Sequence, residues 1–520
     1  MVKPTGTIIF SRSEARGSNR QLLMSKKFAS SVFFGLMLIS CRVKIPDNFK
    51  SSGENVSIYP DYTNLTIPCN IAPLNFTIAE NAEGYLTQIY SKKGSSINLK
   101  GQTVLLRENQ WRTLLSESKG DTLFFQIYLR QGAEWTKYPV IKNYIANEPI
   151  DNYICYRLIE PSFATADELS IRQRDLTSFK EKTLYNNRLV MSDTRGGQCI
   201  NCHSFQDYNR TGNLQVHIRG YLAGTLITKN NQLEKFNLKT DSTISAGVYP
   251  AWHPYLDVIA YSVNLTHQNF HTKDNQKVEV QDRKSGLILY DIAKNEVSKI
   301  IDAQDELETF PYWASDGKSL YFAAAHYIPK IADLAQDLAL NYENLKYDLY
   351  KIAFNPQTLE FGKVETVFKA SAVGKSATFP RVSPNGKYLM FTMADFGNFH
   401  IWHKTSELYL MNLETGETHN IEELNSDDVE SYHSWSSNGN WVIFSSRRED
   451  GAYTRFYLTY FDGKGNFHKP FVLPQKAPQF YRQFFKSFNI PEFLIEPVDF
   501  SPHDFLKAVK RTSQKVVFAD

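Results

Sequence analysis

The residues that point most clearly to chemistry are two cysteines and a histidine near the middle of the chain. Residues 196–203 read Gly-Gly-Gln-Cys-Ile-Asn-Cys-His, so Cys199, Cys202 and His203 form a Cys-x-x-Cys-His pattern. This pattern is typical of covalent c-type haem attachment. Two thiols three positions apart on one turn can add to the two vinyl groups of one porphyrin, and the adjacent imidazole then binds the iron. The motif predicts one haem c, attached at both cysteines, with His203 as the proximal ligand.

Two other chemistries use paired cysteines at this spacing. A thioredoxin-like redox pair is expected between a strand and a helix of a βαβ unit, and the sequence shows no such alternation. A structural zinc site of four cysteines would need a second cysteine pair with similar short spacing, and the sequence has none. Haem attachment is therefore the favoured interpretation.

The sixth iron ligand stays open between three alternatives. Leu214, Val216 and Ile218 share one face of an expected strand, which sends His217 to the other face. His217 can then turn toward the porphyrin, or it can be a hydrogen-bonded histidine on a half-exposed strand. Met191 is a second candidate for the distal iron ligand, and an open or differently ligated site is the third alternative.

The N-terminal region carries the features of an export signal. From Met24 the sequence has a basic pair, an apolar stretch over residues 28–39 that is too short to span a bilayer, and a small residue before Cys41. Residues 38–41, Leu-Ile-Ser-Cys, resemble the bacterial lipobox, which implies cleavage before Cys41 and acylation of that cysteine. A plain anchor helix with an incidental cysteine is the alternative.

Residues 24–40 are thus expected to be a lipoprotein signal peptide. Residues 1–23 are polar and resemble no targeting element, which favours a translation start at Met24. Acyl chains on Cys41 would anchor the protein without spanning the membrane. We expect a protein of the cell envelope, periplasmic or associated with the outer membrane.

Charge and cysteine content narrow the function classes further. The 58 basic and 55 acidic residues are mixed along the chain, so no nucleic-acid-binding face is predicted. A monomer is the expectation. In an oxidising compartment Cys69 and Cys155 form either a disulfide or two buried free thiols, and the sequence does not decide between them.

The second half of the chain contains a repeat. Most units have an apolar strand, a tight turn with Asp-Gly or Asn-Gly, and a second apolar strand, and further strands follow. This order predicts four-stranded propeller blades, in a chain whose 14% aromatic content already favours β structure. The units begin at residues 249–252, 310–313, 379–382 and 432–435.

Two of these turns resemble a known family. Ser-Pro-Asn-Gly-Lys-Tyr-Leu at residues 383–389 and Ala-Ser-Asp-Gly-Lys at 314–318 are similar to the WD-like repeats of TolB-type β-propellers, and the resemblance covers roughly residues 199–470. It implies the architecture and says little about function. With a sixth blade closed by residues 153–179 and the C-terminal tail, we expect a six-bladed propeller over residues 151–520.

The repeat also places the haem motif. Cys202-His203-Ser204-Phe205 stands where Tyr249-Pro250-Ala251-Trp252 stands in the next unit, so the motif opens a blade. In propellers of the family that the chain resembles, this segment begins the innermost strand. The resemblance therefore implies a haem near one mouth of the central channel.

Two regions outside the repeat have expected structures of their own. Residues 41–150 show short alternating segments separated by turn residues, which predict a small antiparallel, β-sandwich-like domain between anchor and propeller. Residues 331–345 have apolar positions typical of a short surface helix. The predicted fold class is therefore all-β, with a propeller preceded by a small antiparallel domain.

Three functions compete. Electron transfer to a redox partner protein through the haem is favoured. A haem enzyme or redox sensor would need an open distal position. A propeller that binds a peptide, glycan or envelope partner, with a structural or sensing haem, is the third. A hydrolase is disfavoured because the sequence lacks Gly-x-Ser-x-Gly. We therefore expect an electron carrier or binding protein rather than an enzyme.

Propellers that carry Cys-x-x-Cys-His resemble bacterial envelope proteins that are sometimes labelled as cytochrome c biosynthesis proteins. That label can reflect the motif alone.

Overall fold

A computed structural model describes residues 43–159, 168–190, 197–270 and 278–519. By contacts, the chain divides into residues 1–42 and 43–520. The expected signal peptide, Cys41 and the candidate ligand Met191 lie outside the described residues. Every structural statement below concerns the described part.

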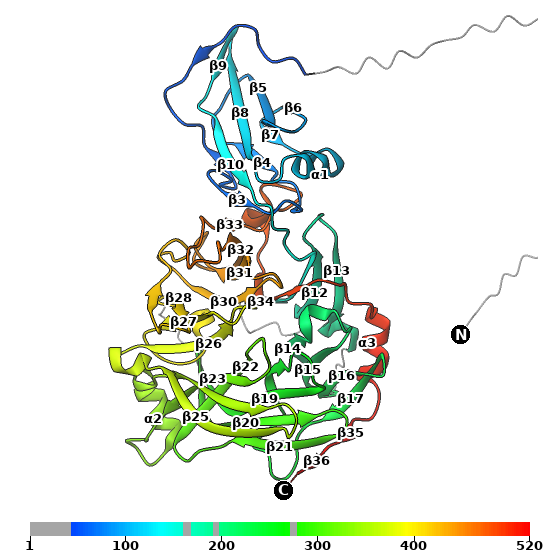
Figure 1. The fold of residues 1–520 in the computed structure, drawn as a ribbon, viewed down its shortest axis with the longest axis vertical. Helices are drawn as coiled ribbons and strands as arrows, with labels where there is room; N and C mark the ends of the chain where they lie inside the picture. The colour runs from blue at the N-terminus through cyan, green and yellow to red at the C-terminus, as the bar shows by residue number, and fades with distance from the viewer. Residues whose placement is uncertain (1–42, 160–167, 191–196, 271–277, 520) are drawn as a thin grey trace, which may run out of the picture. The chain divides into compact units, whose positions relative to one another are not determined.

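Residues 43–150 form two sheets and one helix (Figure 1). The larger sheet has the order β1-β9-β8-β10-β3, with β5 pairing to β8 and β6, and the smaller sheet has the order β2-β4-β7. Most pairs are antiparallel, but β1–β9 and β3–β10 are parallel. The strands are β1 (Lys50–Ser51), β2 (Ile58–Tyr59), β3 (Thr66–Ile67), β4 (Phe76–Ile78), β5 (Gly84–Ser91), β6 (Ile97–Lys100), β7 (Thr103–Val104), β8 (Thr122–Gln131), β9 (Glu134–Lys137) and β10 (Ile141–Ile145).

The helix of this domain, α1 (Glu108–Glu117), was not predicted from the sequence. Its buried side chains are Trp111, Leu114 and Leu115, which have helical spacing and form one apolar face. The Trp111 indole donates a hydrogen bond to the carbonyl of Ile71, at 2.9 Å. The helix is therefore held by packing and by a buried hydrogen bond rather than by a capping side chain.

Six further sheets of four or five strands make up the rest of the described chain, and the predicted propeller is confirmed (Figure 1). In five of them the strands pair in chain order, which is the hairpin order of propeller blades. These five are β14 (Gln198–Phe205), β15 (Leu214–Gly220), β16 (Gly224–Lys229) and β17 (Gln232–Asn237); β18 (Val248–Trp252), β19 (Val258–Phe270), β20 (Val278–Asp291) and β21 (Glu296–Ile301); β22 (Glu306–Trp313), β23 (Ser319–His326), β24 (Asp348–Asn355) and β25 (Glu360–Phe368); β26 (Ser376–Val382), β27 (Tyr388–Ala394), β28 (Glu407–Asn412) and β29 (Thr418–Asn420); and β30 (Glu430–Trp435), β31 (Trp441–Ser446), β32 (Arg455–Tyr460) and β33 (Phe471–Val472).

The remaining sheet joins the two ends of the propeller. Strands β11 (Tyr153–Ile159), β12 (Ser170–Asp175) and β13 (Glu181–Asn186) pair with one late strand, β34 (Ser487–Leu494), in the order β13-β12-β11-β34. The β11–β34 pairing is antiparallel. Because the last strand completes the first sheet, the ring is closed by backbone hydrogen bonds between distant parts of the chain.

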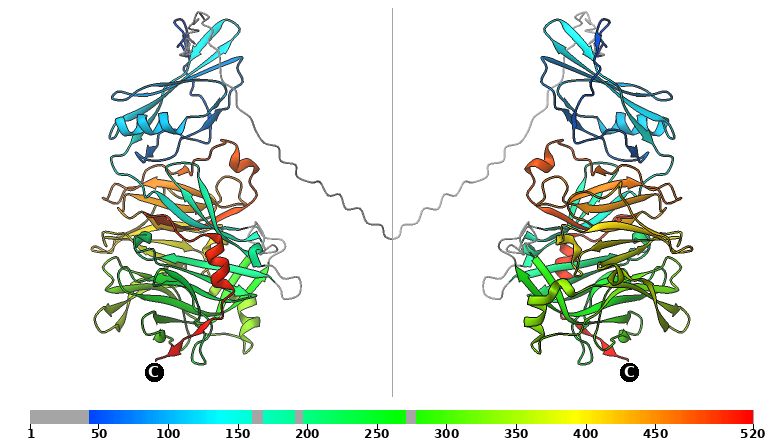
Figure 2. Two further views of the ribbon diagram at one scale, coloured as in Figure 1. Left: turned by 90° about the vertical axis from the view of Figure 1, so that its right-hand side faces the viewer. Right: turned by 90° about the vertical axis from the view of Figure 1, so that its left-hand side faces the viewer.

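The tail after β34 runs along the outside of the propeller (Figure 2). Helix α3 (Pro502–Val509) begins with a capping box formed by Ser501 and Asp504. Its buried Phe505, Ala508 and Val509 join the apolar cluster of the neighbouring sheets. Strands β35 (Gln514–Lys515) and β36 (Val517–Phe518) then add to β17 and β21 in parallel.

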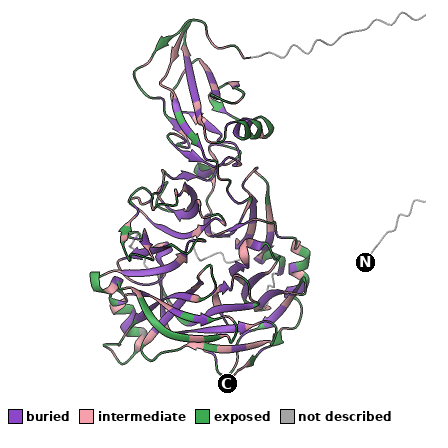
Figure 3. Cartoon of the chain, viewed as in Figure 1, coloured by how far each residue is buried: buried purple, intermediate pink, exposed green. Residues whose placement is uncertain are grey.

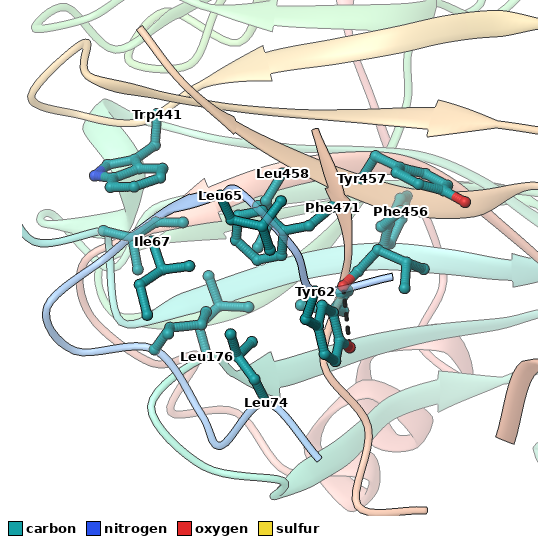
Figure 4. Close-up of a cluster of buried hydrophobic side chains, with 14 of the residues drawn as sticks. Tyr62, Leu65, Ile67, Leu74, Leu176, Trp441, Phe456, Tyr457, Leu458 and Phe471 are labelled. Atoms are coloured by element: carbon teal, nitrogen blue, oxygen red, sulfur yellow. Dashed lines mark hydrogen bonds between the residues drawn. The ribbon is translucent and has the colours of Figure 1, made fainter. Parts of the chain in front are cut away.

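Most inner strands of the propeller are buried along most of their length, because each sheet packs between two others, whereas the outer strand β25 is largely exposed (Figure 3). One apolar cluster also crosses from the N-terminal domain into the propeller: Tyr62, Leu65 and Ile67 pack with Trp441 and Leu458 (Figure 4). The Tyr62 hydroxyl donates to the carbonyl of Val472 at 3.4 Å. The N-terminal domain is therefore packed against the propeller by a shared core.

The predicted surface helix at residues 331–345 is present in shortened form. Helix α2 spans Leu334–Asn341. Its Asp337 and Leu338 are buried, and the Asp337 carboxylate accepts hydrogen bonds from the backbone amides of Lys330 and Ile331.

Candidate functional site

The inner strands of the six sheets share a feature that builds the centre of the propeller. In each of them, the ladder shifts register at one residue that has a positive φ. A β-bulge of this kind bends a strand and redirects side chains. The six residues are Cys202 (φ 43°), Tyr249 (48°), Phe310 (52°), Phe379 (53°), Tyr432 (45°) and Ile490 (50°).

The side chains at these positions form an apolar ring, here called the aromatic ring. Neighbouring aromatic side chains in it are in contact. The distance between their ring centroids is 4.4 Å for Tyr249 and Phe310, 4.3 Å for Phe310 and Phe379, and 4.4 Å for Phe379 and Tyr432. Ile490 packs against the same cluster, as does Ile401. Cys202 occupies the sixth position. The close stacking offsets the cost of about 1–2 kcal/mol that a left-handed conformation imposes on each non-glycine residue.

A cavity of about 360 Å³ lies beside the aromatic ring and is lined by residues from all six inner strands. Three indoles, those of Trp252, Trp313 and Trp435, contribute to its walls together with Tyr208. A concave site with aromatic walls and a few polar groups is the usual form of a small-molecule site. Two residues beyond each member of the aromatic ring, the inner strands place Ser204, Ala251, Tyr312, Arg381, Ser434 and Glu492 on the cavity wall.

The charged groups of this wall have shifted pKa values. The Arg381 guanidinium lies 4.5 Å from the centre of the Tyr312 ring, and burial lowers its pKa. Burial raises the pKa of Glu492 to about 8, although Arg381 and the backbone amide of Phe205 act in the opposite direction. That amide donates to Glu492 Oε2 at 3.3 Å. At neutral pH, Arg381 is therefore charged and Glu492 is mostly a neutral acid.

His203 lies at a repeat position where four of the six inner strands have proline. The same position holds His433, whose Nε2 is 2.9 Å from the carbonyl oxygen of Met390 in the preceding sheet. Both imidazoles are buried, and burial lowers each pKa to about 3, so both are neutral at pH 7. The His203 imidazole lies beside backbone groups of Ile490 and Cys155, and its Nε2 lies 3.6 Å from Glu492 Oε1.

The structure does not bring the three groups of the Cys-x-x-Cys-His motif together. The motif lies within β14, the first strand of its sheet, where the repeat placed it, but the two cysteines are on an extended strand and not on one turn. Cys199 pairs with Arg219, whereas His203 pairs with Val216, and these two partners point to opposite faces of β15. Cys202, at the bulge, belongs to the aromatic ring. Thiols and imidazole that point in different directions do not fit a porphyrin held by all three in this arrangement.

The expected strand around His217 is present. Leu214, Val216 and Ile218 are buried in one apolar cluster, and His217 is on the other face of β15. Its Nδ1 lies 3.0 Å from Thr225 Oγ1, and burial lowers its pKa to about 3. His217 and His203 therefore lie on opposite faces of the sheet. The structure does not bring the candidate distal ligand to the side of the proximal one.

The cysteines are free thiols in the described residues. Cys69 and Cys155 are both buried, so of the two alternatives the structure has free thiols rather than a disulfide. Cys199 is partly exposed, and Asn201 Nδ2 donates to its sulfur at 3.7 Å. Cys202 is buried, and burial raises its pKa.

Sequence reasoning missed Arg381, Glu492 and His433 as residues of a site. Arg381 and His433 lie inside the recognised repeat, where a polar residue among aromatic and proline positions was the available signal. Glu492 lies in Ile490-Pro491-Glu492-Phe493, a sixth copy that lacks the leading aromatic. Because Ile490 stands in place of the aromatic residue, the repeat pattern did not identify this copy.

Comparisons with known proteins give likenesses of fold. The chain is similar to the β-propeller domain of the Trilobed protease from Pyrococcus furiosus, at 12% identity over 76% of this chain and 99% of that one, with a TM-score of 0.29. It is also similar to a prolyl endopeptidase, at 11% identity over 61% of this chain and 42% of that one, with a TM-score of 0.31. The chain therefore spans about two fifths of that protein. A third similar structure is an oligogalacturonate lyase in complex with manganese, at 11% identity over 83% of this chain and 100% of that one, with a TM-score of 0.25. These likenesses carry no argument about function.

No family model and no curated protein matches the chain. In the part that the structure describes, no group of three or more His, Cys, Asp or Glu side chains is arranged to hold a metal ion. No helix of that part is long and apolar enough to cross a bilayer.

Proposed function

We propose that the chain is a binding module of the cell envelope, whose propeller takes a peptide, a glycan or part of an envelope partner into the central cavity. The observation that carries this proposal is the cavity itself, which all six inner strands line and which combines aromatic walls with polar groups. Propellers use such central pockets because residues from every blade converge there.

Two residues that line the cavity each have a buried polar atom without a hydrogen-bond partner. The Nδ1 of His433 and the Nε1 of Trp252 are buried and make no hydrogen bond. In two other sheets the equivalent indole N–H groups have partners. Trp313 donates to the backbone carbonyl of Ala251 at 3.0 Å, and Trp435 donates to the backbone carbonyl of Arg381 at 3.1 Å. Buried polar groups normally have partners. Because neither atom is exposed to the cavity, a bound ligand could satisfy it only after the side chain turns toward the cavity.

A blocking variant tests the proposal. Ser434→Tyr places a large ring on the cavity wall, at a repeat position where Tyr312 shows that the inner strand accepts tyrosine. Ser242→Tyr, at an exposed position, is the matched control. Acidic and neutral sugars and capped dipeptides, at millimolar concentration, serve as probes, and the thermal unfolding midpoint reports binding.

We expect at least one probe to raise the midpoint of the wild type and of the control, with little effect on Ser434→Tyr. A ligand present at 100 times its Kd stabilises by about 2.7 kcal/mol, which is readily measured. The proposal fails if no probe binds, or if the blocked variant binds as tightly as the wild type.

A second candidate function is electron transfer by a covalent haem c, attached at Cys199 and Cys202 with His203 as proximal ligand. One observation favours it: the thiols of Cys199 and Cys202 are both free. The haem would supply one-electron redox chemistry. It would require strand β14 to adopt a different local conformation, because the present one separates the three groups.

Expression in cells with a cytochrome c maturation system decides between the two candidates. Covalent haem would add the mass of one porphyrin and give a Soret band, and both would be lost in Cys199→Ser/Cys202→Ser. A protein of unmodified mass without a Soret band would eliminate this candidate and leave the binding module.

We also propose that the propeller belongs to the TolB-type group and that Cys41 is acylated. The repeat turns and the lipobox-like residues 38–41 support these proposals. Cys41→Ser should release the mature protein from the membrane fraction. Retention of the variant in the membrane would argue for the alternative, an anchor helix.

A further inference from the structure

We infer that the central cavity selects ligands that carry a carboxylate, and that Arg381 is the residue that binds it. This inference rests on the proposed function, because it names the chemistry of the ligand for the same cavity. It depends on the position of the Arg381 guanidinium, on the groups beside it and on the walls opposite.

The guanidinium of Arg381 is available for an anion. It donates to the carbonyl of Pro380, in its own strand, at 3.1 Å, and it stacks on the Tyr312 ring at 4.5 Å. Neither contact supplies a negative charge. Arginine has five donors in a planar fork, which matches the two oxygens of a carboxylate.

The other ionisable groups of the cavity wall do not cancel this charge. Glu492, whose pKa is about 8, is mostly neutral at pH 7. Asp207 is paired with Arg210 at 2.8 Å. His433 and His203 have pKa values of about 3 and are neutral. The wall therefore presents one uncompensated positive charge to a ligand in a partly desolvated site, where an anion is favoured.

Groups on the next two inner strands can complete the anion site. Arg381, Ser434 and Glu492 occupy the same repeat position on β26, β30 and β34 and all line the cavity. A hydroxyl and a protonated carboxyl can each donate one hydrogen bond to a carboxylate oxygen. Each of these three residues can therefore donate to an anion at neutral pH.

The other arc of the wall is apolar and aromatic. It contains Ala251, Trp252 and Trp313, next to Tyr312. Flat ring faces of this kind pack against a sugar ring or an aromatic side chain. The ligand class is therefore a carboxylate joined to a ring, which an acidic sugar or the C-terminus of a peptide with an aromatic residue can provide.

Matched pairs of probes test the inference. Galacturonate is compared with galactose, and N-acetylphenylalanine with its amide, by isothermal titration calorimetry and by the fluorescence of the cavity tryptophans. The protein variants are Arg381→Met, which removes the charge, and Arg381→Lys, which keeps the charge but loses the planar fork. Arg112→Met, at an exposed position on α1, is the control for loss of one arginine.

We expect one acid to bind at least tenfold more tightly than its neutral partner. Arg381→Met should weaken that acid roughly 10- to 100-fold and leave the neutral partner unchanged, because a hydrogen-bonded charge contributes on this scale. Arg381→Lys should be intermediate, and Arg112→Met should match the wild type. The identity of the acid that binds then distinguishes a sugar from a peptide terminus.

Failure of this inference differs from failure of the proposed function. If neutral probes bind the cavity as well as acids do, or if Arg381→Met binds the acid with wild-type affinity, the carboxylate specificity is wrong and the binding module stands. If no probe binds and Ser434→Tyr changes nothing, both are wrong. The thermal midpoint of each variant without ligand shows whether it has folded.

Discussion

At Phe379, a member of the aromatic ring, substitution by glycine should destabilise the protein less than substitution by alanine. Phe379 is buried in the ring, has a φ of 53°, and its centroid lies 4.3 Å from that of Phe310 and 4.4 Å from that of Tyr432. Truncation to alanine removes this packing but leaves a Cβ atom in the left-handed region. Truncation to glycine removes the packing and the backbone strain together.

The magnitudes follow from these two effects. Phe379→Ala should lower the free energy of unfolding by about 3–5 kcal/mol, the usual cost of emptying a buried phenylalanine site. The left-handed conformation costs a residue with a Cβ about 1–2 kcal/mol, while glycine in a strand costs about 0.5–1 kcal/mol relative to alanine. Phe379→Gly should therefore be more stable than Phe379→Ala by about 1 kcal/mol.

Denaturant unfolding followed by tryptophan fluorescence measures this difference through the midpoint and the slope. The control is Ala377→Gly, two residues earlier on β26, at a buried alanine outside the set of positive-φ residues. It should lose about 0.5–1 kcal/mol. If Phe379→Gly is less stable than Phe379→Ala by the same amount, the reasoning about strain in the inner strands is refuted.

Three further predictions concern other parts of the molecule. The folded pKa of Glu492, about 8, lies above its ordinary value of 4.5, so the folded state binds more protons and the wild type loses stability as pH rises from about 4.5 to 8. Unfolding midpoints across that range should fall less steeply for Glu492→Gln, and equal slopes would contradict a buried neutral acid. A thiol reagent should label Cys199 in the native protein before the other described cysteines, because it alone among them is partly exposed; peptide mapping that finds a different order would count against this arrangement. Ser501→Ala removes an N-cap worth about 0.5–2 kcal/mol, so amide exchange in α3 should accelerate, and an unchanged rate would show that the capping box does not hold the helix.

The fold class could be read from the sequence because its signals are local. Asp-Gly and Asn-Gly turns specify hairpins from the backbone preferences of a few residues, and each hairpin makes part of one sheet. The turn at residues 383–389 shows this, since Gly386 has a φ of 71° where the pattern requires it. Helix α1 was missed although Trp111, Leu114 and Leu115 have helical spacing, because the surrounding region was interpreted by its β alternation.

The candidate site shows the limit of the same approach. By itself the sequence determined which residues carry reactive groups: the thiols of Cys199 and Cys202, the imidazole of His203, and the repeat that contains them. Only the tertiary structure decided where these groups point. The bulge at Cys202 and the pairing of β14 with β15 send Cys199 and His203 to opposite faces, and neither feature is encoded in the spacing of the motif. Likewise, Arg381 and Glu492 share a cavity because ring closure through β34 brings residues more than a hundred positions apart to one wall, and long-range pairing of that kind leaves no local pattern in the chain.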